Sequence, residues 1–480
     1  MSEAREYTAK KWVLVLTSAA SFMVALDALV VTTALSTIRA DLGASIETLE
    51  WIVNAYNLTF AVLLLTGAAL GDRFGRRRIF AAGLALFVVA SAACALSASA
   101  GALIAARAAQ GIGAALVMPL AMALLGAAFP REQRGKALGI LSGITGIALI
   151  AGPVAGGAIA TGVDWRWIFW INLPIGAITI ALAQYFVPES RAPRARRFDP
   201  VGQLLVLTAL FTLVYAIIEG PRHGWGSPLI VALFSVSAAA VIGVVLYEPH
   251  RAEPLLDLRF FRSLPFASAT LIAICMFGAF SGFLFLNALY LQDSRAQSAL
   301  AAGLSTMPIA LATVTFAPIS GRLISRYGTR PSLVLAGIAI ATGAVMLTTL
   351  DATTTVPWLV ASYASVGIGF GLANPPITNT AVSGMPRAQA GVAAAVASTS
   401  RQIGASLGVA LGGTIASTAS RGAAAQFAGA THAFWWLAAG AGAAISVLGV
   451  VSTGATARAS VRRIAALLED PPPPPPGARA

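Results

Sequence analysis

Apolar residues run through this chain in long blocks that are separated by short polar segments. Each block has about 20 residues, the length of helix that crosses a hydrocarbon layer about 30 Å thick. Gly and Pro occur inside several blocks, which membrane helices tolerate because neighbouring helices satisfy the freed backbone groups. We count fourteen blocks, at 12–36, 47–70, 79–99, 101–126, 136–160, 166–187, 200–219, 227–246, 266–290, 299–324, 331–350, 357–376, 398–419 and 432–452. The pattern predicts an all-helical integral membrane protein with fourteen transmembrane helices.

Composition supports this interpretation. Of the 480 residues, 57% are hydrophobic and only 11% are charged, whereas an ordinary soluble domain has about 25% charged residues. A soluble fold could not cover so much apolar surface with so few ionic groups. Membrane lipid is therefore the predicted surrounding of the chain.

The net charge of +13 raises the question of nucleic acid as a partner. With the N-terminus in the cytoplasm, 25 of the 32 Lys and Arg residues fall on the inner side of the membrane. This bias is typical of multispanning proteins, in which it sets the orientation. The basic loops at 73–78 and 191–197 are thus explained first as topology signals. We predict a cell (plasma) membrane protein with both termini cytoplasmic and no nucleic-acid partner.

The residues that carry metal or catalytic chemistry form no cluster in the sequence. Cys94 and Cys275 lie inside predicted spans without metal-ligand spacing. The three histidines are scattered, at His223, His250 and His432. The one Gly-Lys pair, Gly135-Lys136, lacks the phosphate-binding pattern that ATP driving would need. We predict no enzyme, no cofactor and no metal site.

The sequence repeats itself at an offset of about 255 residues. The matched segments are 72–77 with 325–330, 110–113 with 366–369, 130–135 with 386–391, and 152–157 with 408–413. Matched Pro, Arg and Gln residues at fixed spacing make chance a poor explanation in this Ala- and Gly-rich chain. An even number of spans separates the copies, so both have the same orientation in the membrane.

The repeat predicts two six-helix bundles in parallel pseudo-repeat, 12–187 and 266–452. Two additional transmembrane helices, 200–246, lie between them, and 453–480 forms a cytoplasmic Pro-rich tail. Parallel halves with a binding site at their interface are a transporter architecture.

The loop after the second block combines one acid with four arginines in a very tight hairpin. Gly75 permits the turn. Asp72 ends the preceding helix where cationic neighbours or a helix N-terminus can hold it. A short basic loop set only by topology would not explain an acid among arginines. We therefore predict that Asp72, Arg73, Gly75 and Arg76 take part in gating.

Two charged residues lie inside predicted spans of the first half. Arg107 shares a helical face with Gln110, and an arginine at a helix centre costs about 2.5–3.5 kcal/mol on insertion scales, so it should face a partner or a wet cavity. The alternative is that Arg107 snorkels to the interface. Asp27 is the only acid near the middle of a span and lies within one helical turn of the depth of Arg107.

Asp27 and Arg107 could pair or compete for a proton. Burial disfavours the charged form of a carboxyl group and a nearby cation favours it, which makes Asp27 a candidate proton switch. The alternative is a static buried ion pair that holds helices together. We predict that Asp27 and Arg107 couple transport to protons.

The fifth block carries a stripe of small residues, Ala148, Gly152 and Gly156. Such stripes let a neighbouring helix approach closely, and Pro153 kinks the helix. The Gly-Pro pair makes the pattern more specific than a small-residue stripe alone. We predict that Gly152, Pro153 and Gly156 belong to a flexible seal between the halves.

These motifs resemble those of the major facilitator superfamily, and within it the fourteen-helix drug:proton antiporter family. The segment 67–80 resembles motif A of that superfamily, and 103–115 resembles motif B. The segment 148–157 resembles motif C, which is associated with antiporters, and 26–38 resembles the first-helix motif of the drug exporters. The segment 165–174 also looks like this family. The resemblance covers about residues 12–452.

The resemblance implies roles for three charged residues. Asp72 would latch the cytoplasmic gate, Arg107 would take part in proton translocation, and Asp27 would be a coupling or cation-sensing acid. The chain departs from the family pattern at Ala68, Ala148, Ser325 and Val409. The second half also has no acid in the membrane interior, which disfavours multivalent cationic substrates.

Together these patterns predict a monomeric secondary transporter that exports small hydrophobic or amphiphilic organic molecules, such as drugs and antibiotics, in exchange for protons. The polar residues predicted to line the substrate cavity are Gln110, Asn287, Tyr290, Gln292, Asn374 and Asn379. One alternative is a metabolite transporter of the same fold without proton antiport. A membrane receptor or enzyme is the remote alternative.

Overall fold

The computed structural model describes residues 3–191, 199–251, 254–255, 257–351, 353–385, 389–419 and 424–468, and in these ranges all regular structure is helical. The helices of the first half are α1 (Glu3–Leu42), α2 (Ile46–Phe74), α3 (Arg76–Ala95), α4 (Ala100–Ala128), α5 (Arg131–Gly162), α6 (Trp167–Trp170) and α7 (Asn172–Phe186). They are followed by α8 (Pro200–His223), α9 (Pro228–Tyr247) and the short η1 (Glu248–His250) and η2 (Leu258–Arg262). The second half contains α10 (Leu264–Leu289), η3 (Tyr290–Ser294), α11 (Ala299–Ser305), α12 (Met307–Tyr327), α13 (Thr329–Leu347), α14 (Val356–Ser383), α15 (Ala390–Ala419), α16 (Ala424–Val451) and α17 (Ala455–Leu468).

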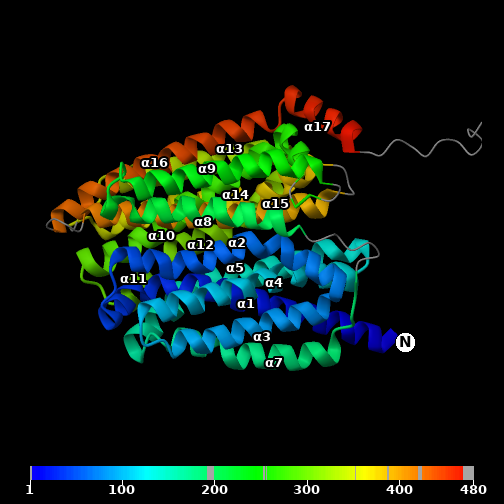
Figure 1. Cartoon of the computed structure of the whole chain (residues 1–480), viewed down its shortest axis with the longest axis horizontal. Coiled ribbons are helices and arrows are strands. Elements are labelled where there is room, and N and C mark those ends of the chain that lie inside the picture. Colours follow the sequence, from blue (N-terminus) through cyan, green and yellow to red (C-terminus); the bar gives the residue numbers. More distant parts are fainter. Residues whose placement is uncertain are drawn as a thin grey trace, which may run out of the picture.

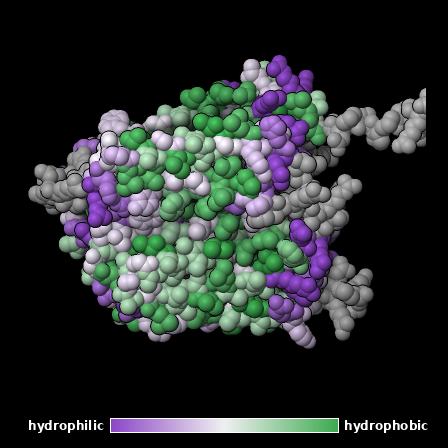
Figure 2. Space-filling view, viewed as in Figure 1, coloured by the Kyte–Doolittle hydropathy of each residue, from purple (hydrophilic) through white to green (hydrophobic). Residues whose placement is uncertain are grey.

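Thirteen helical segments among the described residues are long and apolar enough to cross a membrane. Figure 2 shows a broad apolar surface around the middle of the molecule, with hydrophilic residues gathered at its two ends. The 30-residue helix α15 is not among the thirteen; it is rich in Gly, Ser and Thr and carries Arg401. The predicted all-helical membrane fold is confirmed, and the count of fourteen spans stays a prediction.

Two blocks that we predicted as single spans each contain a break between two helices, although each still forms one candidate span. The block 299–324 separates into α11 and α12 at Thr306, and Pro308 stands in the first turn of α12. Proline has no backbone N–H to donate, so it fits the first turn of a helix better than the interior. The block 166–187 likewise separates into α6 and α7 at Ile171.

The packing of the helices repeats between the two halves. In the first bundle α1 packs on α5, α2 on α4 and α3 on α4. In the second bundle α10 packs on α15, α12 on α14 and α13 on α14. Corresponding helices thus have corresponding neighbours, as the sequence repeat predicts.

The two ends of the molecule differ in charge. One end carries the N-terminus, α17 and the turn at Gly75 with its neighbours Arg76, Arg77 and Arg78 (Figure 1). We call this the basic end. The other end, which carries the turn at Gly43 between α1 and α2, is called the opposite end.

The two bundles are in contact through α2 with α15 and α5 with α11. Polar contacts between them gather at the opposite end: Arg39 pairs with Asp293 (2.9 Å), Gln292 donates to the Thr33 carbonyl (3.0 Å), and the Leu300 amide donates to the Thr161 hydroxyl (3.1 Å). The molecule is therefore closed at the opposite end.

The additional helix α8 lies against both bundles. Gln203 of α8 donates to the Val62 carbonyl of α2 (2.7 Å) and is hydrogen-bonded to the Thr66 hydroxyl. From the other bundle, Thr414 of α15 donates to the Ile217 carbonyl of α8 (2.7 Å). Helix α8 thus lies beside the α2–α15 seam, and α9 packs on α8.

The predicted tail from 453 onward is in part a helix. Residues Ala455–Leu468 form α17, in which Ala457 and Ile464 are buried. The Ser460 hydroxyl accepts a hydrogen bond from the Leu264 amide at the start of α10 (3.0 Å). The apolar residues among the arginines of this segment explain why it packs on the bundle. The proline run 471–476 lies outside the described residues.

Glycines allow the backbones of the two bundles to meet at the opposite end. A Cβ built on Gly303 of α11 would lie 2.9 Å from the Pro153 carbonyl carbon of α5. A Cβ built on Gly157 of α5 would lie 2.8 Å from the Ala299 carbonyl carbon. Closure of the α5–α11 seam therefore requires residues without a side chain at these positions.

Gly303→Val should favour separation of the bundles at the opposite end, because overpacking a tight contact costs about 1–3 kcal/mol. We expect a longer distance between spin labels placed at Ala102 and Val356, one on each bundle at that end. Gly321→Val is the control, since nothing lies within 4 Å of a Cβ at Gly321. Equal distances in both variants would contradict this interpretation of the seam.

Candidate functional site

Asp27 of α1 and Arg107 of α4 form a buried ion pair inside the first bundle. Their side chains are each 1% exposed, and Arg107 Nη1 lies 2.5 Å from Asp27 Oδ2. The other carboxylate oxygen, Oδ1, accepts from Gln110 Nε2 (2.7 Å) and from Asn172 Nδ2 (2.8 Å). All three donors are N–H groups, so both oxygens act only as acceptors, as in an ionised carboxylate.

Arg107 is held from several sides, so it does not snorkel to the surface. Its Nε donates to the Ile52 carbonyl (3.3 Å) and its Nη1 also donates to Gln110 Oε1 (2.6 Å). The guanidinium lies 4.2 Å from the centre of the Tyr56 ring, a favourable cation–π contact. Asp27 and Arg107 are therefore at the same depth, as predicted, and in direct contact.

The network reaches five helices. Ser91 of α3 accepts from Gln110 (2.8 Å) and from Asn172 of α7 (3.3 Å), and Tyr56 and Ile52 belong to α2. Sequence analysis did not single out Ser91, Tyr56 or Asn172 as site residues. Asn172 gives the clearest signal in retrospect, because an amide inside an apolar block needs a hydrogen-bonding partner.

The network includes contacts that do not depend on the Asp27 carboxylate. The described residues contain no group of His, Cys, Asp and Glu that could bind a metal ion. Arg107 also contacts Gln110 and the ring of Tyr56, which hold the guanidinium in place beside Asp27. The Asn172 side-chain oxygen has no partner among the described residues, which leaves the network an unused acceptor.

The hairpin at the basic end has the predicted turn. Gly75 has a φ of 114°, a region that favours glycine. The Asp72 carboxylate pairs with Arg76 Nη2 (2.7 Å) and accepts from Arg76 Nε (2.9 Å). Arg73 is exposed and lies over the ring of Phe74. The carboxylate of Asp72 is thus held within its own hairpin while the bundles are closed at the opposite end.

Glu189, which sequence analysis missed, holds the same hairpin from the end of the first bundle. Its carboxylate accepts from the backbone amides of Arg77 (3.0 Å) and Arg78 (3.3 Å) at the N-terminus of α3. A carboxylate at a helix N-terminus is stabilised by the unpaired amides and the helix dipole. Two acids therefore anchor the basic hairpin, Asp72 from within it and Glu189 from the segment after α7.

The small-residue face of α5 packs on α1. A Cβ on Gly152 would lie 2.7 Å from Leu29 Cβ, and one on Gly156 would lie 2.7 Å from the Val30 carbonyl oxygen. The Pro153 carbonyl instead faces Gly303 of the other bundle. The predicted gating residues of α5 thus lie on two faces, one within the bundle and one at the seam.

The structure does not bring the six predicted substrate-cavity residues together. Gln110 belongs to the Asp27 network, and Asn287 is bound by the Tyr363 hydroxyl. Tyr290 donates to the Asp351 carbonyl (2.6 Å), and Gln292 joins the bundles at the opposite end.

The last two candidates lie on α14. Asn374 is half-buried, and Asn379, nearer the basic end, is exposed. They remain predictions.

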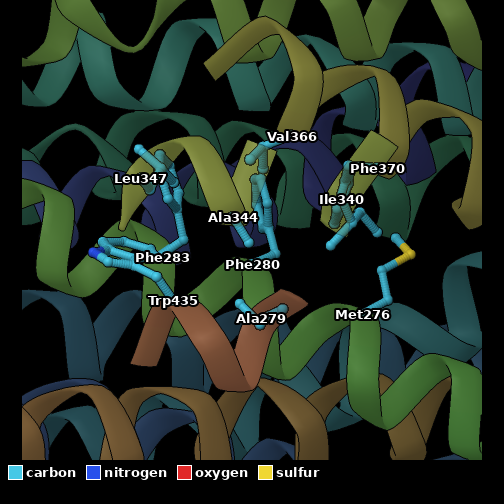
Figure 3. Close-up of a pocket in the computed structure, with 11 residues that line it drawn as sticks. Met276, Ala279, Phe280, Phe283, Ile340, Ala344, Leu347, Val366, Phe370 and Trp435 are labelled. Atoms are coloured by element: carbon cyan, nitrogen blue, oxygen red, sulfur yellow. The ribbon is translucent and has the colours of Figure 1, made fainter. Parts of the chain in front are cut away.

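Figure 3 shows a cavity within the second bundle. It lies between α10, α13, α14 and α16, has a volume of about 20 Å³, and is lined by apolar and aromatic side chains such as Phe280, Phe283, Phe370 and Trp435. That volume would hold about one water molecule, and an apolar cavity of this size stays dry. None of the predicted polar candidates lines it.

Arg401 of α15 is a further charged residue, and it lies in the second bundle. It contacts the hydroxyl groups of Thr378 and Ser398, and its guanidinium lies 5.9 Å from the centre of the Phe277 ring. Its Nε has no partner among the described residues. The helices α10 and α12–α16 contain no Asp or Glu, so no carboxylate of these helices neutralises it.

The structure has two bundles with repeated helix packing, a seam between them and a buried ion pair. Two parallel halves of this kind are the architecture of multi-pass membrane transporters. The family model of the Major Facilitator Superfamily matches residues 17–409. The chain belongs to this superfamily of transporters and is not an enzyme.

Its relatives are drug- and antibiotic-resistance proteins. The multidrug resistance protein Stp of Mycobacterium tuberculosis (strain CDC 1551 / Oshkosh) is 36% identical over 403 residues, covering 84% of this chain and 75% of that protein. The tetracenomycin C resistance and export protein of Streptomyces glaucescens is 36% identical, with 82% and 73% covered. A crystal structure of a D-xylose-proton symporter matches with a TM-score of 0.63 and 16% identity, covering 92% of this chain and 96% of that one. The last likeness shows the fold.

Arg107→Ala should destabilise the first bundle strongly, because it leaves the Asp27 carboxylate buried without its cation. Breaking a buried ion pair on one side costs about 3–5 kcal/mol. Thermal unfolding in detergent, followed by tryptophan fluorescence, should show a lowered Tm that the double variant Asp27→Asn/Arg107→Ala partly restores.

Arg259→Ala is the control, because its ion pair with Asp257 is local and Arg259 is 54% exposed. Such a pair contributes about 0–1 kcal/mol. If both single variants unfold alike, the buried pair does not stabilise the bundle.

Proposed function

We propose that the protein is a secondary active transporter that exports small hydrophobic or amphiphilic organic molecules in exchange for protons. The observation that carries this proposal is the buried Asp27 carboxylate, paired with Arg107 and reached by five helices of one bundle. A carboxyl group in such a place can change the packing of a whole bundle when it gains or loses a proton.

The orientation follows from the positive-inside rule, with the basic end and both termini in the cytoplasm. Counting α15 gives fourteen spans, which brings the C-terminus to the same side as the N-terminus. The closed opposite end then faces outward, and in this state the transporter is expected to receive its substrate from the cytoplasm.

The cycle then requires the bundles to rock. The substrate enters from the cytoplasm, the contacts at the outer end part, and Asp27 becomes accessible to protons from outside. Proton uptake by Asp27 removes the charge that holds Arg107 and favours substrate release and return. One pH unit supplies about 1.4 kcal/mol per proton, and 100 mV adds about 2.3 kcal/mol per charge.

The names of the relatives support organic antibiotics as the class of substrate. They include resistance to tetracenomycin C, methylenomycin A and puromycin. Arg401 supports a charge preference within that class, because a cation without a carboxylate partner repels polycations. Neutral molecules, or molecules with a phenolate or carboxylate group, fit this environment best.

Asp27→Asn should remain inserted and folded, because Asn is nearly isosteric with Asp, but should lose proton-coupled export. The measurement uses reconstituted vesicles loaded with a pH-sensitive dye, in which substrate addition drives proton movement by the wild type. We expect substrate-driven proton flux to fall to the level of empty vesicles.

Two outcomes would contradict the proposal. Retained proton flux in Asp27→Asn would leave Asp27 a structural role. Substrate movement by the wild type that ignores an imposed pH gradient would instead favour a metabolite transporter without antiport.

Arg401→Gln should change which substrates are exported. Removing the cation should weaken export of molecules that carry a phenolate or carboxylate and relieve the exclusion of dications. A drug-susceptibility panel in cells expressing wild type or variant checks this, with Arg295→Gln at the opposite end as the control. A uniform loss of resistance to all compounds would instead indicate a folding defect.

A further inference from the structure

Glu50 is a fully buried acid that the proposed proton cycle does not use. It lies in the second turn of α2, at the opposite end of the molecule, and its side chain is 0% exposed. Neither carboxylate oxygen has a hydrogen-bond partner among the described residues. Sequence analysis passed over it because it lies only three residues inside the predicted block 47–70.

The Glu50 side chain lies in the seam between the two bundles. It packs directly on Gly413 of α15, where a Cβ would overlap its carboxyl group. One turn further along the seam, the Ser406 hydroxyl of α15 donates to the Asn54 side chain of α2 (2.7 Å). Glu50 is therefore buried only while α2 and α15 stay together.

The charged groups around Glu50 do not neutralise it. The ionisable groups that act on it electrostatically are Glu47 of α2 and Glu219 of α8, and both are acidic. Glu219 faces two basic groups of its own helix, His223 (3.5 Å) and Arg222 (3.9 Å). The helix α15 contributes glycine at the contact, and its one charged residue, Arg401, lies twelve positions, or about 18 Å at 1.5 Å per residue, away along the helix.

Keeping the Glu50 carboxylate ionised at this buried position would cost much free energy. Burial without a cation or hydrogen bonds costs several kcal/mol, so such a group is carried in its neutral form. If α2 and α15 separate, Glu50 meets water, in which a glutamate is ionised at neutral pH. Closing the seam therefore takes up a proton, and opening it releases one.

We infer that Glu50 is a proton-operated latch of the opposite end, where its protonation permits α2 to close on α15. The inference rests on the alternating access of the proposed function and adds a second proton-binding carboxyl to it. The latch is separate from Asp27, which has its own cation and lies inside one bundle. The additional helix α8 supports the latch by placing the acidic Glu219 against the seam.

The sign of the pH dependence follows from proton linkage. The closed form binds one more proton at Glu50 than the open form, so a falling pH favours closure. For one proton, the ratio of closed to open molecules changes by up to about tenfold per pH unit. Once Glu50 is deprotonated in both forms, the ratio no longer changes with pH.

The experiment measures this ratio without any substrate. Spin labels at Ala102 and Val356 report the separation of the bundles at the opposite end, in a Cys275→Ala background that keeps the buried Cys94. Distances are measured in lipid nanodiscs from pH 5 to pH 9. For the wild type we expect the short-distance population to fall as pH rises, and for Glu50→Gln we expect it to stay high throughout.

Three further variants make the result specific. Glu50→Asp keeps a carboxyl group and should keep the pH dependence, which shows that loss in Glu50→Gln is not a folding defect. The Asp27→Asn variant should also keep the pH dependence of the distances, although it should lose substrate-driven proton flux. Failure of the latch and failure of the proposed transport cycle can therefore be told apart. Glu219→Gln should move the transition to lower pH, because a repelling charge is gone.

The inference is overturned if the wild-type distances do not change with pH. It is equally overturned if Glu50→Gln follows the wild-type pH dependence, or if that dependence disappears in Asp27→Asn and survives in Glu50→Gln.

Discussion

The ion pair between Asp27 and Arg107 is the interaction on which the first bundle depends. Two charges far from water are stable only if they pair with each other and further hydrogen bonds satisfy their remaining donors and acceptors. Here the further contacts come from three different helices. Gln110 and Asn172 donate to Asp27, and the ring of Tyr56 lies against Arg107. The bundle is therefore built around a polar centre, and any change in the charge of Asp27 is felt by all its helices.

The second bundle is organised differently, although it repeats the same helix packing. Its interior is apolar and aromatic, with Phe280 stacked on Phe370 at 4.1 Å, and its one interior cation, Arg401, has no acid beside it. One half thus holds a paired acid and base in its interior, and the other holds a cation that no carboxylate of helices α10 and α12–α16 neutralises. Two copies of one helix packing therefore have different charges at their centres.

Much of the fold could be predicted from the sequence because lipid imposes one simple rule, that long apolar blocks become helices. The depth of Asp27 and Arg107 followed from counting residues along two helices, and the turn at Gly75 from the need for a positive φ. The division at Thr306 was missed because Pro308 can either kink a helix or begin one. Helix α17 was missed because its buried face is formed by only a few residues between arginines.

The partners of the site residues were harder to predict because they depend on how helices rotate against each other. Asn172 and Ser91 are ordinary polar residues in the sequence, and only packing turns them toward Asp27. Asn287 is predicted to line the substrate cavity, and its hydrogen bond with Tyr363 could not be predicted from the sequence. Glu50 lies so close to a block boundary that water could have reached it, and it is the closeness of Gly413 that excludes water.

The position of α8 also makes the two seams unequal toward the bilayer. The α2–α15 seam is covered by α8, on which α9 packs, whereas none of the described helices beyond the two bundles packs on the α5–α11 seam. An amphiphile dissolved in the membrane thus meets additional helices at the α2–α15 seam, whereas it meets none of the described ones at the α5–α11 seam. The extra helix pair therefore gives the lipid-facing surface two different sides, with α8 and α9 on one of them.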